Sequence, residues 1–80
     1  MPDVSTGTTM IKFGSSLRIG YRAEGSASAF TYLPQYYSQA QLPLTFTVPS
    51  SGSWEIEYSE ICPNCSGGIY SDSVITIVNV

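Results

Sequence analysis

The chain has 80 residues and a formal net charge of −3, and only 11% of its residues are charged, compared with about 25% in ordinary soluble domains. This length fits one domain with a single thin core and no buried substrate cavity beside it, so we expect the function to lie on the surface. Its three cations cannot neutralise a run of phosphates, so nucleic acid is not an expected partner.

The weakly charged surface has two interpretations. It is an ordinary neutral surface, or it belongs to a module that packs against copies of itself or a larger assembly. No signal peptide is visible at the amino end, and no apolar run approaches the roughly 20 residues of a membrane span, so we expect no membrane insertion. The chain fits a complete, cytosolically made product, but a domain cut from a larger secreted protein would look the same.

Apolar residues recur with a period of two in several short runs, and no window has the spacing of an amphipathic helix. This pattern predicts an all-β protein. Glycine, serine and proline at 23–29 and 49–53 predict turns, and a longer loop lies between Pro34 and Pro43. We expect one β-sandwich domain over residues 1–80, with residues 1–8 as a flexible N-terminal segment. The patterned runs cover 9–13, 17–22, 30–32, 44–48, 54–58 and 74–78.

The last run is apolar on both faces. One face would carry the even-numbered residues Val74, Val78 and Val80, and the other face would carry Ile75 and Ile77. Because successive side chains of a strand point to opposite faces, this strand is either covered twice within the domain or covered on one side by a partner.

The order of these motifs resembles the later strands of a fibronectin type III domain. The resemblance covers most of the chain, from Arg18-Ile-Gly-Tyr-Arg22 through Trp54-Glu-Ile-Glu57 to Ser71-Asp-Ser-Val74. It implies a small antiparallel sandwich, with another immunoglobulin-like sandwich as the alternative.

The resemblance fails at the amino end. The family has two full strands before the first matched one, whereas residues 1–16 contain one patterned run. We therefore expect a sandwich that lacks one N-terminal strand. An unfilled sheet edge exposes unpaired N–H and C=O groups and invites strand addition from a neighbouring subunit.

The chain is also similar to the small immunoglobulin-like modules of tailed-bacteriophage virions. This similarity implies a non-enzymatic structural protein that decorates or connects a head, tail or fibre, with neighbouring virion subunits or copies of itself as partners. The alternative is an extracellular or cell-surface adhesion module that binds a glycan. Neither class requires a cofactor, and the resemblance assigns no binding residues.

The two cysteines, Cys62 and Cys65, lie in Cys-Pro-Asn-Cys, and the chain has no histidine. A thioredoxin-type Cys-x-x-Cys works because its first sulfur lies at a helix N-terminus that stabilises the thiolate. Here Ser-Gly-Gly follows Cys65 and opposes a helix, so redox catalysis is not expected. Zinc requires four ligands, so a zinc site would need two chains, each giving Cys62 and Cys65. The simplest interpretation is a small disulfide across the loop, or two thiols in a tight turn. A disulfide would indicate an oxidising location.

Three polar or aromatic residues of the long loop are candidates for an interaction surface, namely Tyr36, Tyr37 and Gln39. A tyrosine ring offers a rigid apolar face with a polar tip, which suits a sugar or a protein interface. Alternatively, one tyrosine folds back and covers the edge of the sandwich. We assign Trp54 and Tyr58 to the core.

Glu55, Glu57 and Glu60 resemble a carboxylate cluster. On a strand, however, Glu55 and Glu57 point to one face, and no histidine, lysine or second acidic cluster completes a general acid and base pair. We expect them on a solvated strand face. Either one pairs with Arg18 or Arg22 across the sheet, because their strands are neighbours in the fold that the chain resembles.

Overall fold

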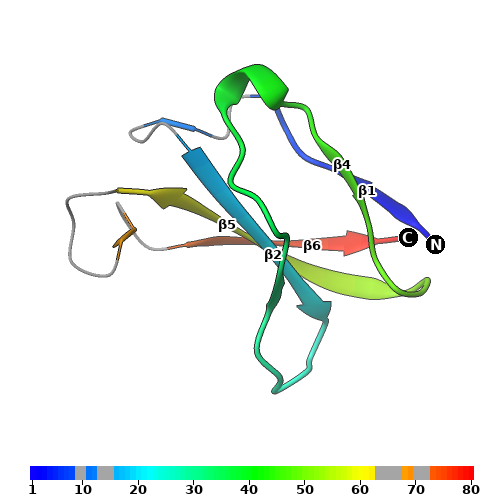
Figure 1. Ribbon diagram of the computed structural model, residues 1–80. Helices are drawn as coiled ribbons and strands as arrows, with labels where there is room; N and C mark the ends of the chain where they lie inside the picture. The colour runs from blue at the N-terminus through cyan, green and yellow to red at the C-terminus, as the bar shows by residue number, and fades with distance from the viewer. Residues whose placement is uncertain (9–10, 13–15, 63–67, 70–72) are drawn as a thin grey trace.

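The computed structural model describes residues 1–8, 11–12, 16–62, 68–69 and 73–80. Within this part, six antiparallel strands form two sheets (Figure 1). The small sheet pairs β1 (Asp3–Ser5) with β4 (Thr45–Thr47). The large sheet has the order β3 (Thr31–Tyr32), β2 (Ser16–Ala23), β5 (Ser53–Ile61) and β6 (Val74–Asn79). The predicted all-β antiparallel sandwich is confirmed.

One short 3₁₀ helix, η1 (Gln39–Gln41), interrupts the loop between β3 and β4. The N–H of Ser38 donates to Oε1 of Gln41 at 2.8 Å, which holds the start of this turn. No helix in the described ranges is long and apolar enough to cross a membrane.

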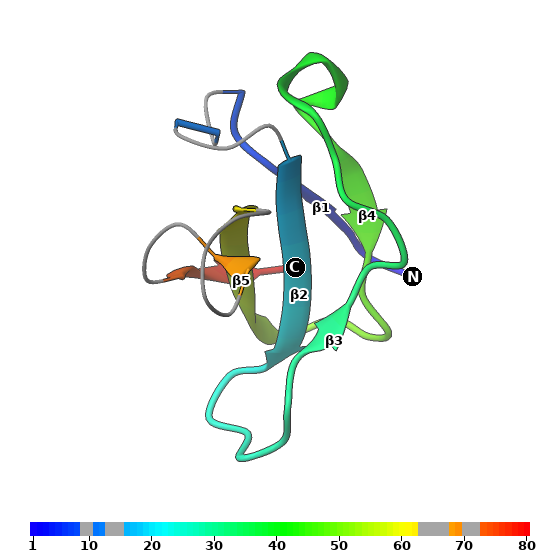
Figure 2. The same cartoon turned by 60° about the vertical axis from the view of Figure 1, so that its left-hand side comes forward.

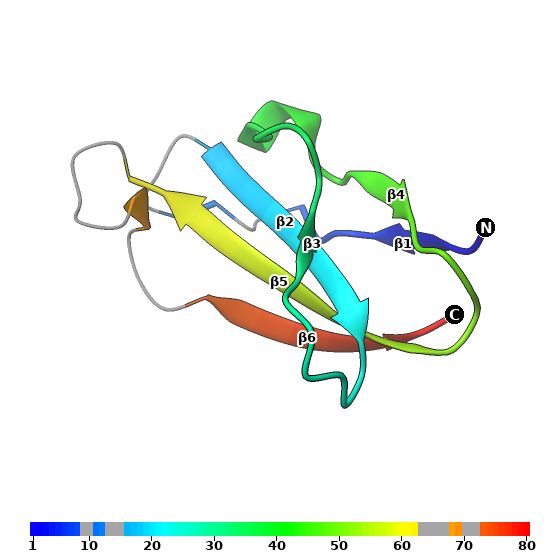
Figure 3. The ribbon, with the colours of Figure 1, turned by 60° about the horizontal axis from the view of Figure 1, so that its bottom comes forward.

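β2 and β5 form the centre of the large sheet (Figure 3). Their register runs without interruption from Ser16 opposite Ile61 to Ala23 opposite Trp54. Because side chains alternate between faces, one face of this pair carries aliphatic and aromatic groups and the other carries arginines and glutamates.

The core fills the space between the two sheets. Trp54 and Tyr58 are buried in it, as the sequence predicted, and the indole N–H of Trp54 donates to the carbonyl of Ser50 at 2.9 Å. That bond satisfies the one polar group that the indole brings into the interior. The buried members of the core are Val4, Leu17, Ile19, Phe46, Val48, Trp54, Ile56 and Tyr58.

The expectation that residues 1–8 form a flexible segment was wrong for residues 3–6. Asp3–Ser5 forms β1, which pairs with β4, and both Val4 and Thr6 are buried. The N–H of Thr6 donates to the carbonyl of Leu44, and the Thr6 hydroxyl accepts from the N–H of Leu44, each at 2.9 Å. A strand with one apolar residue gives almost no periodic signal in the sequence. Its pairing with β4 cannot be predicted from the neighbouring residues either, because β4 lies far away along the chain.

The strand predicted at 9–13 is wrong where the structure describes it. Ile11 and Lys12 lie outside any strand, and the rest of this run falls outside the described residues. Ile11 nevertheless packs against the core from irregular backbone, and its N–H donates to Oε1 of Gln39 at 3.4 Å. An apolar residue can therefore reach the core here without a sheet ladder.

Candidate interaction surface

The outer face of the large sheet carries two ion pairs between β2 and β5. The guanidinium of Arg22 lies 2.9 Å from the carboxylate of Glu55, and that of Arg18 lies 3.5 Å from Glu57. The predicted cross-strand pairing is confirmed for both glutamates. Because each carboxylate faces a guanidinium, neither is available as an unpaired general base.

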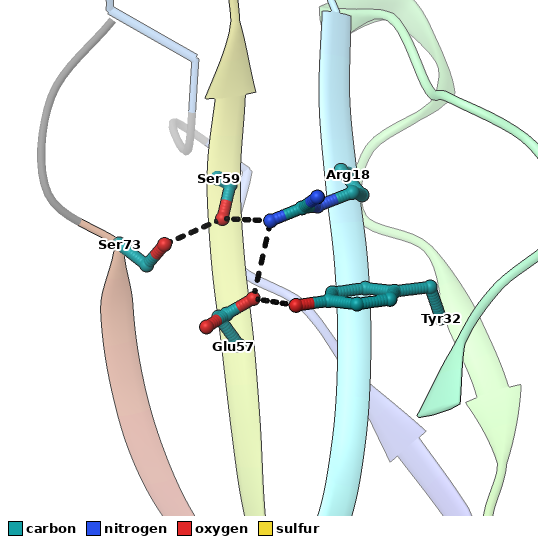
Figure 4. A network of polar contacts seen from close by, with 5 residues as sticks. All are labelled: Arg18, Tyr32, Glu57, Ser59 and Ser73. Atoms are coloured by element: carbon teal, nitrogen blue, oxygen red, sulfur yellow. Dashed lines mark hydrogen bonds and ion pairs between the residues drawn. The ribbon is translucent and has the colours of Figure 1, made fainter. Parts of the chain in front are cut away.

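The Arg18–Glu57 pair belongs to a wider polar network (Figure 4). The Tyr32 hydroxyl donates to Oε1 of Glu57 at 2.7 Å, and Arg18 also donates to the hydroxyl of Ser59 at 3.5 Å. The hydroxyls of Ser59 and Ser73 lie 2.7 Å apart. The network thus crosses the whole sheet, from β3 to the residue that precedes β6.

Gly20 allows this network to form. The Arg18 guanidinium lies 4.1 Å from the centre of the Tyr32 ring, and that ring lies over β2 at Gly20. A Cβ at position 20 would come within 2.6 Å of Tyr32 Cδ1, which is closer than atoms can approach. This network was not predictable from the sequence, because its only local signal is one glycine in an otherwise regular strand pattern.

The electrostatics of this face agree with a closed network. The hydrogen bond to Glu57, and to a smaller extent burial, raise the pKa of Tyr32. The backbone N–H of Gly25 and then the Arg22 guanidinium lower the pKa of Glu55. The described polar groups of this face mainly bind one another, and the Nε of Arg18 is the one buried side-chain nitrogen or oxygen of the described residues left without a hydrogen-bond partner.

The structure separates the two loop tyrosines. Tyr37 and Leu17 exchange backbone hydrogen bonds of 2.8 and 3.0 Å, and the Tyr37 side chain packs against the core. Tyr37 therefore covers the edge of β2, as one of the two interpretations predicted. Tyr36 is 59% exposed.

Gln39 lies in η1 with its side-chain amide directed back to the chain. Its Nε2 donates to the carbonyl of Thr8, and its Oε1 accepts from Ile11. This amide joins η1 to the N-terminal segment. Tyr36 and Gln39 are thus exposed, whereas Tyr37 is half-buried, so Tyr36 is the one exposed aromatic ring among the three candidate residues.

Cys62 is buried at the end of β5, where its N–H donates to the carbonyl of Gly68 at 2.9 Å. It is disulfide-bonded, and Cys65 lies outside the described residues. A disulfide sulfur is not the thiolate that binds zinc, so a shared zinc site would require reduction first. The described residues contain no group of three or more side chains placed to hold a metal ion.

β6 is the edge strand of the large sheet (Figures 2 and 3). Its apolar side chains are exposed on both faces of that sheet. Val74 on the inner face is 58% exposed, and Ile75 and Ile77 on the outer face are 48% and 46% exposed. The inner face stays open because the small sheet has two described strands opposite four. Only Val78 packs against the core. Apart from Val78, the described part of the chain thus leaves the side chains of β6 uncovered.

The free edge of β6 presents a defined set of backbone groups. Val80 and Gly52 exchange hydrogen bonds of 2.7 and 2.9 Å, and the β5–β6 register continues from there to Val74. Because bonded and non-bonded pairs alternate in an antiparallel ladder, the even-numbered residues of β6 bond toward β5. The N–H and C=O groups of Ile75, Ile77 and Asn79 point to the open side.

Comparisons of the chain with protein-family models, curated proteins and solved structures found no match.

Proposed function

We propose that this protein is a non-enzymatic structural module that assembles with other protein subunits through β6. The observation that carries the proposal is an edge strand whose apolar side chains are exposed on both faces and which contains no charged residue or proline. Stable monomers protect such edges with lysine, proline, bulges or a covering segment. An edge without these devices is typical of a surface that becomes buried in an assembly.

The order of strands supports the immunoglobulin-like resemblance. β2, β5 and β6 are consecutive neighbours in one sheet, in the same sequential arrangement as the C, F and G strands of immunoglobulin-type sandwiches. One described strand, β1, precedes β2, where the fibronectin type III pattern has two. On this basis we propose a phage virion as the setting, with neighbouring subunits or copies of the same chain as partners.

Sedimentation velocity over a range of protein concentrations tests the assembly role. The wild-type sedimentation coefficient should rise with concentration, and Ile77→Lys should abolish the rise because it places a charge on the exposed edge. Ala29→Lys is the matched control, since it adds the same charge in an exposed turn. Identical monomers of all three proteins at every concentration would contradict the proposal.

A second candidate function is glycan binding, which rests on the exposed ring of Tyr36. An exposed tyrosine can stack on a sugar face. Glycan-array binding that disappears in Tyr36→Ala would support this function. Tyr37 is unsuitable for the test because its side chain belongs to the core packing.

A further inference from the structure

We propose that β6 pairs with β6 of a second copy of the chain, antiparallel and around a twofold axis, with Ile75 opposite Ile77 of the partner subunit. This inference rests on the proposed assembly function and specifies its contact. The result would be one continuous eight-stranded sheet formed from two large sheets.

The backbone restricts how two such edges can pair. In an antiparallel pair, residues that exchange hydrogen bonds must both point their N–H and C=O groups into the seam. On β6 these are the odd-numbered residues, so the residue opposite Ile75 must be Ile75, Ile77 or Asn79 of the partner subunit. Three symmetric registers are therefore available within the strand.

Side-chain complementarity selects one of the three. With Ile75 opposite the partner's Ile77, four isoleucines meet on the outer face. On the inner face, Val74 lies opposite the partner's Val78, and Thr76 lies opposite the partner's Thr76. Aliphatic pairs of this kind stabilise a sheet, as do threonine pairs that can hydrogen-bond.

The two other registers place apolar side chains opposite polar ones. A shift in one direction sets Ile75 against the partner's Asn79 and Thr76 against the partner's Val78. A shift in the opposite direction sets Ile77 against the partner's Ser73 and Thr76 against the partner's Val74. Each mismatch occurs twice because of the twofold symmetry, so both registers lose matched contacts.

Charge also favours a second copy as the occupant. β6 contains no charged side chain, so the seam brings no like charges together. The nearest carboxylates on β5, Glu55 and Glu57, lie opposite Ile77 and Ile75 and are paired with Arg22 and Arg18. A strand of this length makes a small interface, so we expect a weak dimer that forms at high local concentration.

Single cysteines at three neighbouring positions distinguish the registers. In the proposed register, residue 76 lies opposite residue 76 of the partner subunit. In the two alternative registers, residue 75 lies opposite the partner's residue 75, or residue 77 lies opposite the partner's residue 77. Thr76 would occupy a non-hydrogen-bonded pair with Cα atoms about 4.5 Å apart, which a disulfide can span. The variants are Ile75→Cys, Thr76→Cys and Ile77→Cys. Each variant is oxidised mildly, and the formation of covalent dimers is measured over time by non-reducing electrophoresis. Peptide mass spectrometry then identifies the two cysteines that are linked.

The proposed register predicts that Thr76→Cys forms covalent dimers on the order of tenfold faster than either neighbour alone. A mixture of Ile75→Cys and Ile77→Cys chains should cross-link to each other faster than either does to itself. Fastest self-linking at position 75 or 77 would overturn the register.

Two further outcomes separate this inference from the function on which it rests. If no variant cross-links while the sedimentation coefficient still rises with concentration, the β6 pairing is wrong and assembly uses another surface. If neither cross-linking nor association occurs, both the pairing and the proposed assembly function are wrong.

Discussion

Arg22 and Glu55 lie directly opposite each other on β2 and β5, with the guanidinium and carboxylate 2.9 Å apart. The second carboxylate oxygen of Glu55 accepts from the N–H of Gly25 at 3.0 Å. One side chain thus fixes the strand register and the turn that follows β2.

Glu55→Gln should lower the stability of the fold at neutral pH. The folded state holds the pKa of Glu55 below its ordinary value of 4.5, mainly through the Gly25 N–H. A lowered carboxyl pKa contributes stability above pH 4.5 that is lost as the pH falls through the folded-state value. The stability difference between wild type and Glu55→Gln should therefore shrink in acid, as measured by urea unfolding with Trp54 fluorescence.

Glu24→Gln is the matched control, since Glu24 is an exposed carboxylate beside the same turn. Glu24→Gln should change the free energy of unfolding little, both at neutral pH and in acid. A difference between wild type and Glu55→Gln that grows as the pH falls would show that the sign of this linkage is wrong.

Gly20→Ala should destabilise the protein by about 1–3 kcal/mol, because the new methyl group displaces the Tyr32 ring. In a Tyr32→Ala background the same substitution should cost less, because the two ring contacts are gone and the Cβ of Phe30, 3.2 Å from the new methyl group, is the close neighbour that remains. Urea unfolding of the four proteins of this double-mutant cycle measures both effects. Equal costs in both backgrounds would show that the Tyr32 ring does not require Gly20.

The same conservative truncation can be made on two adjacent strands, as Ile56→Val on β5 and Ile75→Val on β6. The quantity to compare is the loss in the free energy of unfolding. Ile56 is fully buried on β5, so its loss of a methylene should cost about 0.5–1.5 kcal/mol. Ile75 is half-exposed on β6, and its truncation should cost less than about 0.5 kcal/mol. The comparison requires a protein concentration at which the chain is monomeric. An equal cost at both positions would mean that β6 is covered in the monomer.

Glu57→Gln should lower the pKa of Tyr32 toward its ordinary value of 10.0, because the hydrogen bond to Glu57 is the main cause of its rise. Burial raises the pKa of Tyr58, so that tyrosine should be unaffected and serves as the internal control. NMR titration of the assigned tyrosine rings separates the two groups. An unchanged Tyr32 would show that the carboxylate does not hold its hydroxyl.

The fold class was predictable because the long strands carry a clear period-two pattern. Apolar and polar residues alternate over 17–22 in β2 and over 54–58 in β5, and that pattern also placed Trp54 and Tyr58 in the core. β1 was not predictable, since Val4 is its only apolar residue and its pairing with β4 spans about half the chain.

The candidate surface was only partly predictable. The two-sided apolar pattern of β6 was visible in the sequence, but its place at the sheet edge depends on strand order. Tyr36 and Tyr37 are identical and adjacent, so composition could not separate them. Their different environments arise from the backbone pairing of Tyr37 with Leu17.

Amide hydrogen exchange on β6 tests the central claim most directly, because it reports the edge residue by residue. In dilute protein, the N–H groups of Ile75 and Ile77 should exchange fast, and those of Thr76 and Val78, which point toward β5, should exchange slowly. At concentrations where the protein associates, Ile75 and Ile77 should become protected in proportion to the assembled fraction. Fast exchange of Ile75 and Ile77 in the associated protein would contradict assembly through β6, and slow exchange in the dilute monomer would show that the edge is not free.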